Sequence, residues 1–153
     1  ILSWEEQNNP LVAYMDRLSH PDPAIHFEAA RAWSLYEQSC STLKADGGGL
    51  QNYSSSEDHL SLARLEAHYF VNKNFLSENA IIKNLHYIKN KPAIIIQGRY
   101  DIVCPIISAD KLVNNWPGAQ YKILTDAGHS ALEPGIKQEL VLATEMMKKK
   151  YIK

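Results

Sequence analysis

Hydrophobic positions in the first part of the chain recur at helical intervals. Leu11, Met15 and Leu18 are three or four residues apart, which places them on one face of a helix. We therefore expect helical structure over residues 4–39. Residues 19–23 interrupt this run, because their two prolines cannot continue a helix.

The pattern predicts three more helices before residue 90. One begins at Pro23 or Ala24 and reaches Cys40 or slightly beyond, and the others cover residues 60–69 and 77–88. Residues 46–56 separate the first two of these helices and are rich in glycine and serine, so they are expected to form a flexible loop.

The pattern changes near residue 90. Residues 92–98 form a short apolar run that ends in glycine, which is typical of a strand buried on both faces. A helix is predicted over residues 107–116, a second strand over 119–124 and a last helix over 134–151. Strands that alternate with helices in this way are expected to be parallel and joined by crossovers. The fold class is therefore α/β.

Two strands alone would leave sheet edges unpaired and apolar faces uncovered. The chain also begins with Ile1 instead of methionine. We therefore expect it to be part of a longer protein whose N-terminal half supplies the other strands.

Composition excludes several classes of function. The 153 residues carry 16 basic and 17 acidic side chains, so charge gives no reason to expect nucleic acid or an anionic membrane as a partner. Cys40 and Cys104 lie far apart and suggest free thiols in a reducing cytoplasm. No cluster of metal ligands is visible, and no metal or organic cofactor is expected. The sequence does not indicate an oligomeric state.

Two candidate catalytic residues follow the predicted strands. Asp101 comes just after the first strand, and His129 comes just after the second. In open α/β sheets, functional groups gather beyond the C-terminal ends of the strands. An acid followed by a histidine matches the latter part of the chain order Ser, Asp, His in α/β hydrolases. There, histidine acts as general base toward a serine, while the acid holds its tautomer and stabilises the imidazolium.

Taken singly, Asp101 could be a turn former and His129 an incidental surface residue. Their placement on successive strand-end loops favours the catalytic interpretation. The other histidines show no such pattern. The sequence contains no Gly-x-Ser-x-Gly nucleophile motif. Residues 1–153 alone are therefore expected to be inactive.

Several strings together resemble the proline iminopeptidases, which are serine aminopeptidases of the α/β-hydrolase superfamily. The most specific are Glu66-Ala67-His68-Tyr69-Phe70 and Arg99-Tyr100-Asp101-Ile102-Val103-Cys104-Pro105. Further similar strings are Ala30-Arg31-Ala32-Trp33-Ser34 with Glu37, Asn115-Trp116-Pro117-Gly118-Ala119, and Gly128-His129-Ser130-Ala131 with Glu133-Pro134. The resemblance extends from about residue 12 to residue 146. The Lys- and Asn-rich segment before residue 92 lacks the Gly-Gly usual in this family.

The resemblance implies that residues 1–90 form a helical cap that selects the substrate. Residues 91–153 would then be the C-terminal part of the α/β-hydrolase core. It also implies that Glu37 and Glu66 bind the free amine of peptides with an N-terminal proline, because two carboxylates suit a secondary ammonium with two N–H donors. Without the resemblance, both glutamates would be read as solvated helix residues.

Other interpretations remain open at this stage. The protein could be an α/β hydrolase of another specificity, such as an esterase, or a non-catalytic binding module derived from a hydrolase. Cys104 is expected to be a small buried hydrophobic residue, although it could instead border the active site. Trp33, Tyr69 and Phe70 are expected to pack in the cap core rather than touch proline.

Overall fold

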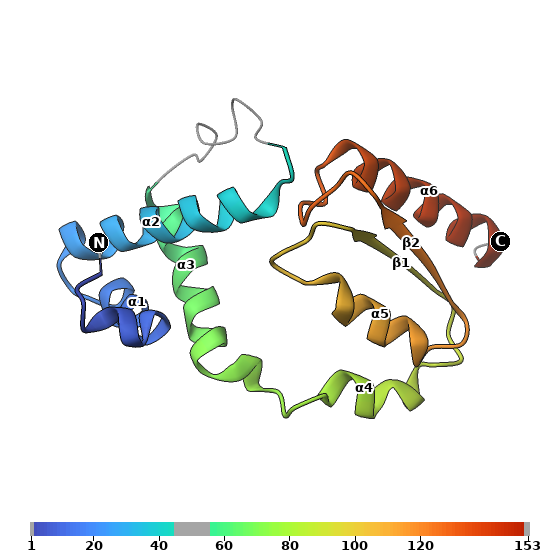
Figure 1. Cartoon of the computed structure of the whole chain (residues 1–153), viewed down its shortest axis with the longest axis horizontal. Coiled ribbons are helices and arrows are strands. Elements are labelled where there is room, and N and C mark those ends of the chain that lie inside the picture. Colours follow the sequence, from blue (N-terminus) through green and yellow to red (C-terminus); the bar gives the residue numbers. More distant parts are fainter. Residues whose placement is uncertain (1, 45–55, 152–153) are drawn as a thin grey trace. The chain divides into compact units, whose positions relative to one another are not determined.

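The structure is a computed structural model that describes residues 2–44 and 56–151 (Figure 1). Its contacts divide the chain into two compact units. The first unit consists of Ile1–Gln38 and Gly47–Glu78, and the second of Ser39–Asp46 and Asn79–Lys153. The loop predicted over residues 46–56 lies outside the described residues, apart from Ser56. Within the described residues, no helix combines the length and the apolar character that crossing a membrane requires.

Helices make up the first unit. After a 3-10 turn, η1 (Glu6–Asn8), come α1 (Pro10–Leu18), α2 (Pro23–Ser41) and α3 (Ser56–Val71). Proline opens α1 and α2, at a position where its missing N–H is not needed. The Asp22 side chain caps α2 by accepting a hydrogen bond from the Ala24 N–H at 2.9 Å. The break predicted at residues 19–23 is therefore confirmed.

Small side chains form the core of this unit. The buried cluster contains Leu18 from α1, two alanines from α2, and Leu60 with two alanines from α3 (Ala29, Ala30, Ala63 and Ala67). Alanine has little volume, so the three helix backbones can approach closely. Arg64 Nε donates a hydrogen bond to the Leu18 carbonyl at 2.7 Å, which satisfies one of the carbonyls left free at the end of α1. Trp33 packs against the cluster, as predicted.

The helix predicted over residues 77–88 is wrong as a continuous element. The structure has a five-residue helix, α4 (Ala80–Asn84), followed by a 3-10 turn, η4 (Leu85–Tyr87). Asn79 has a φ of 57°, in the left-handed region, and this conformation ends any helix that would include residue 77. Hydrophobic spacing does not reveal such a break in the backbone.

The second unit contains a two-stranded parallel sheet. β1 (Ala93–Gly98) pairs with β2 (Ala119–Leu124), with Ala93 opposite Ala119 and Gly98 opposite Leu124. Figure 1 shows the strands lying between α5 (Ile106–Asn114) and α6 (Pro134–Tyr151). Both helices contact β1. The predicted order of strand, helix, strand, helix and the parallel pairing are confirmed.

The burial of β1 differs from the prediction. Its residues from Ala93 to Gln97 are only partly buried, and Gly98 alone is fully buried. In the described residues the sheet contains just these two strands. A strand becomes buried on both faces only when helices and neighbouring strands surround it. The apolar side chains of β1 are therefore less buried here than the composition of the strand predicts.

Candidate active site

Parallel pairing brings the ends of β1 and β2 to the same edge of the sheet. The loop after β1 remains hydrogen bonded to the end of β2 and to the loop that follows β2. The Arg99 N–H donates to the Leu124 carbonyl at 2.8 Å, and the Tyr100 N–H donates to the Ala127 carbonyl at 3.1 Å. The loops that carry the two candidate catalytic residues are thus joined backbone to backbone.

Gly98 permits this close approach. A Cβ atom at this position would lie 1.9 Å from the Gly128 carbonyl oxygen and 2.8 Å from that of Ala127. Real Cβ atoms do not approach backbone oxygens so closely. Only glycine therefore fits where the end of β1 lies against the loop that follows β2.

Asp101 is buried and held from several directions. Its side chain is 6% exposed. Oδ1 accepts hydrogen bonds from the N–H groups of Val103 at 3.0 Å and Cys104 at 2.7 Å. Oδ2 accepts a hydrogen bond from Gln97 Nε2 at 3.1 Å. These donors fix the rotamer of the carboxylate and direct Oδ2 to the histidine.

His129 meets Asp101 as expected. Nδ1 of His129 lies 3.1 Å from Oδ2 of Asp101. An ionised carboxylate only accepts hydrogen bonds, so Nδ1 carries the proton in this contact. In the neutral ring Nε2 then has the free lone pair, which is the tautomer that a general base needs. The His129 side chain is 36% exposed, so a reactant can reach the ring.

The loop around His129 is held by residues to which the sequence assigned no role. The N–H groups of His129 and Ser130 both donate to the Ser41 carbonyl, at 3.0 and 2.8 Å. Oε1 of Glu133 accepts a hydrogen bond from the Gly128 N–H at 2.8 Å and a longer one from the Leu43 N–H at 3.4 Å. Residues 41–43, at the C-terminal end of α2 and just beyond it, therefore hold the histidine loop in place through hydrogen bonds.

Gln97 was also missed by sequence reasoning. It lies on β1, and its Nε2 contacts both Asp101 Oδ2 and the Cys104 carbonyl, the latter at 3.1 Å. Its spacing of four residues before the acid is the one signal that the sequence offered, because an amide near a buried carboxylate can donate to it.

Cys104 corrects an expectation, because the residue is exposed rather than buried. It lies in the turn that wraps Asp101, where its N–H donates a hydrogen bond to Oδ1 of that carboxylate. Partial desolvation of the thiol, and then the negative charge of Asp101, raise the pKa of Cys104 above its ordinary value.

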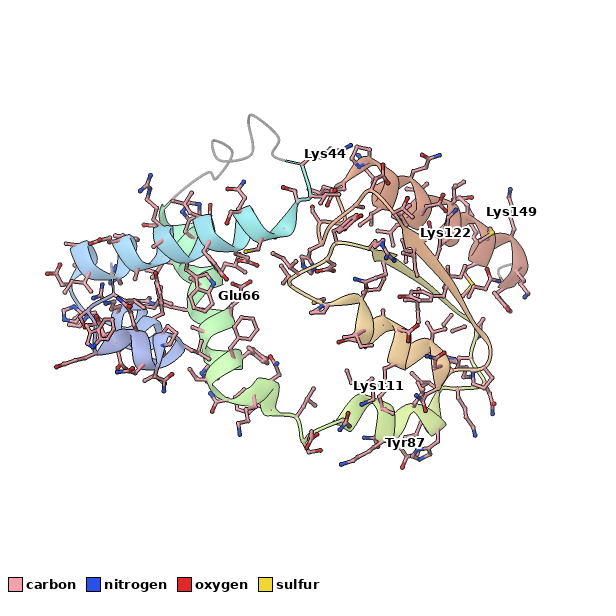
Figure 2. All side chains as sticks on the ribbon, in the orientation of Figure 1. Lys44, Glu66, Tyr87, Lys111, Lys122 and Lys149 are labelled. Atoms are coloured by element: carbon pink, nitrogen blue, oxygen red, sulfur yellow. The ribbon has the colours of Figure 1, made fainter. Side chains whose placement is uncertain are left out.

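Glu37 and Glu66 lie in the first compact unit, on α2 and α3 (Figure 2 labels Glu66). Both side chains are partly buried. Oε2 of Glu66 accepts a hydrogen bond from Trp33 Nε1 at 2.7 Å. Trp33 precedes Glu37 by one helical turn, so these two residues share a face of α2. The Tyr69 and Phe70 side chains, expected in the core, are each 49% exposed.

The part of the chain that the structure describes contains no group of three His, Cys, Asp or Glu side chains placed to hold a metal ion. The residues brought together here are an acid and a histidine, along with their backbone and amide donors. This arrangement can move a proton at Nε2 of His129 and can stabilise the positive charge that results.

Comparison with solved structures defines the fold. A lipase from Acinetobacter baumannii superposes with a TM-score of 0.52 at 16% identity, covering 94% of this chain and 48% of that one. No family model matches the sequence. The chain is the C-terminal part of an α/β-hydrolase fold, built from parallel strands with crossover helices and preceded by helices.

Sequence comparison with curated relatives is more specific about the family than the comparison of folds. Over 150 residues the chain is 44% identical to a proline iminopeptidase of Arabidopsis thaliana, and over 141 residues it is 40% identical to one of Xylella fastidiosa. A proline iminopeptidase of Neisseria gonorrhoeae is 37% identical over 143 residues. These alignments cover 92–97% of this chain and 40–45% of the relatives. The chain is thus homologous to proline iminopeptidases and spans less than half of their length, which confirms the resemblance.

Proposed function

We propose that the complete protein is a serine aminopeptidase that releases N-terminal proline from peptides. The names of the relatives support this proposal. The observation that carries it is the 3.1 Å contact between His129 Nδ1 and Asp101 Oδ2 at the C-terminal edge of parallel strands. The order acid then histidine is that of α/β hydrolases.

In this proposal, the serine comes from a part of the protein outside residues 1–153. His129 Nε2 takes the proton from the serine hydroxyl as the oxygen attacks the prolyl carbonyl. The imidazolium then gives this proton to the leaving amine when the peptide bond breaks. Asp101 stabilises the imidazolium throughout. Water releases proline from the acyl-enzyme by the same proton transfers in reverse order.

Glu37 and Glu66 are assigned to the substrate amine. A peptide that begins with proline carries a secondary ammonium, whose charge and two N–H donors suit two partly desolvated carboxylates. Internal peptide bonds lack that charge. Residues 1–90 would act as the cap that carries these carboxylates, and residues 91–153 as the C-terminal part of the catalytic core. We place the enzyme in the cytoplasm, and we expect residues 1–153 alone to be inactive.

The test uses the full-length protein and two chromogenic amides, one of proline and one of N-acetyl-proline. Acetylation removes the ammonium and leaves the scissile bond. We expect turnover of the prolyl amide and at least a hundredfold lower kcat/KM, on the order of two charge-assisted hydrogen bonds, for the acetylated one. Equal turnover of the two amides would remove the role given to the glutamates and favour an esterase-like hydrolase.

The catalytic dyad is tested separately. Asp101→Asn should lower kcat by about 10⁴, because the amide favours the wrong tautomer of His129. Asp126→Asn is the matched control, since Asp126 is an exposed residue on the loop after β2. A loss of less than tenfold in the Asp101 variant would show that this residue does not orient the histidine.

A further inference from the structure

The side chain of Trp33 is engaged through its only polar atom. Nε1 donates to Oε2 of Glu66 at 2.7 Å, joining residues 33 positions apart in the sequence. The ring lies edge-on to Tyr14, with centroids 5.6 Å apart, and is stacked near Phe70 at 6.2 Å. Trp33 also packs against the buried cluster of the first unit. These ring contacts therefore hold the indole in place, and its single N–H donates to one oxygen of the Glu66 carboxylate.

The other oxygen of the Glu66 carboxylate, Oε1, is left for another partner. Among residues 2–44 and 56–151, no group donates to Oε1 of Glu66. A glutamate side chain has several rotatable bonds and loses considerable freedom when it is fixed. A hydrogen bond that fixes one oxygen before a ligand arrives removes that cost from the binding step.

We infer that Trp33 is a positioning residue that holds Glu66 in the orientation that receives the prolyl ammonium. This inference rests on the proposed function, because it deepens the role given there to Glu66. Trp33 does not touch the reacting atoms. It acts through the carboxylate, and its N–H is the part of the side chain that matters for binding.

The arrangement around Trp33 also relates the two glutamates. Glu37 is one helical turn beyond Trp33 on α2, and Phe70 is one turn beyond Glu66 on α3. The indole thus lies on the same helix face as one carboxylate and is hydrogen bonded to the other. Loss of the Trp33 N–H should loosen Glu66. It should leave Glu37, which lies on the same helix as Trp33, unaffected.

The experiment measures binding without turnover. Pyrrolidine is used as the probe, because its ring ammonium reproduces that of an N-terminal proline and it has no scissile carbonyl. Its competitive inhibition constant is measured on the full-length enzyme with the prolyl amide as substrate. Trp33→Phe, which keeps an aromatic ring and removes the donor, should raise this constant by about tenfold, on the order of one hydrogen bond to a charged group. The KM should rise with it, and kcat should change much less.

Control variants distinguish the effect of losing the Trp33 N–H from a general effect of replacing a tryptophan or of poor folding. Trp116→Phe is the control, because Trp116 Nε1 also donates one hydrogen bond, to the Lys91 carbonyl at 3.1 Å, in the second unit. It should leave pyrrolidine binding unchanged. Replacing Trp33 with benzothienylalanine, which has the shape of tryptophan with sulfur in place of N–H, tests the donor if Trp33→Phe folds poorly. Thermal melting curves report the folding of each variant.

A double-mutant cycle with Glu66→Ala decides between outcomes. If Trp33 acts through Glu66, Trp33→Phe should have no further effect on pyrrolidine binding once Glu66 is alanine. If Glu66→Ala weakens binding but Trp33→Phe does nothing, or adds its effect in full, the inference fails and the proposed function stands. If Glu66→Ala leaves binding unchanged, the proposed role of the carboxylate is itself wrong.

Discussion

Gly98→Ala in the full-length protein tests how closely the two catalytic loops must approach. The added Cβ would lie 1.9 Å from the Gly128 carbonyl oxygen, whereas ordinary carbon to oxygen contacts are about 3.3 Å. The loops must therefore separate by roughly 1.4 Å, and no side-chain rotation relieves the contact because the opposing atom is backbone. A misplacement of about 1 Å can reduce a rate by 10².

We expect Gly98→Ala to lower kcat for the prolyl amide by at least about a hundredfold. It should also lower the free energy of unfolding by about 1–3 kcal/mol, the usual cost of overpacking. The assay combines steady-state kinetics with denaturant unfolding. Loss of activity in a variant that remains folded at the assay temperature would report the separation of Asp101 from His129.

Gly118→Ala is the control for this prediction. A Cβ at Gly118 meets nothing within 4 Å, and no glycine of the described residues has a positive φ. Activity should be retained, and stability should be unchanged or raised by about 0.4–1 kcal/mol because alanine restricts the unfolded chain. The reasoning is refuted if Gly98→Ala keeps more than a tenth of the wild-type kcat, because the loops would then tolerate separation.

Three further predictions concern single contacts. Glu133→Ala removes the acceptor of the Gly128 N–H and should lower the free energy of unfolding by about 1–3 kcal/mol, measured in denaturant; an unchanged midpoint would contradict it. Glu6 has a pKa lowered from 4.5 to about 2, first by its hydrogen bond with Arg17. Its contribution to stability is therefore present above pH 4.5 and is lost as the pH falls toward 2, and NMR titration of Arg17→Leu should show the Glu6 pKa returning toward 4.5. Cys104 should be alkylated by iodoacetamide more slowly at pH 8 than a free peptide thiol, because its pKa is raised; equal rates would count against this.

Most helices and strands could be predicted because their signals are local. The helical spacing in α1, the prolines around the start of α2 and the apolar run of β1 each lie within a few residues. The exception is the segment over residues 77–88, where the left-handed backbone at Asn79 interrupts a favourable spacing. Burial was less predictable than the elements themselves, as Cys104 shows, because it depends on what packs against each residue.

The chain order alone was enough to expect Asp101 and His129 at one edge of a sheet, since parallel strands with crossover helices bring their C-terminal ends together. Only the tertiary structure decided what holds them there. Glu133 and Leu43, which meet beside the histidine loop, are 90 residues apart. In the first unit, the hydrogen-bonded Trp33 and Glu66 are 33 residues apart. Such contacts depend on how whole helices and loops pack in three dimensions, and spacing along the chain contains no record of that packing.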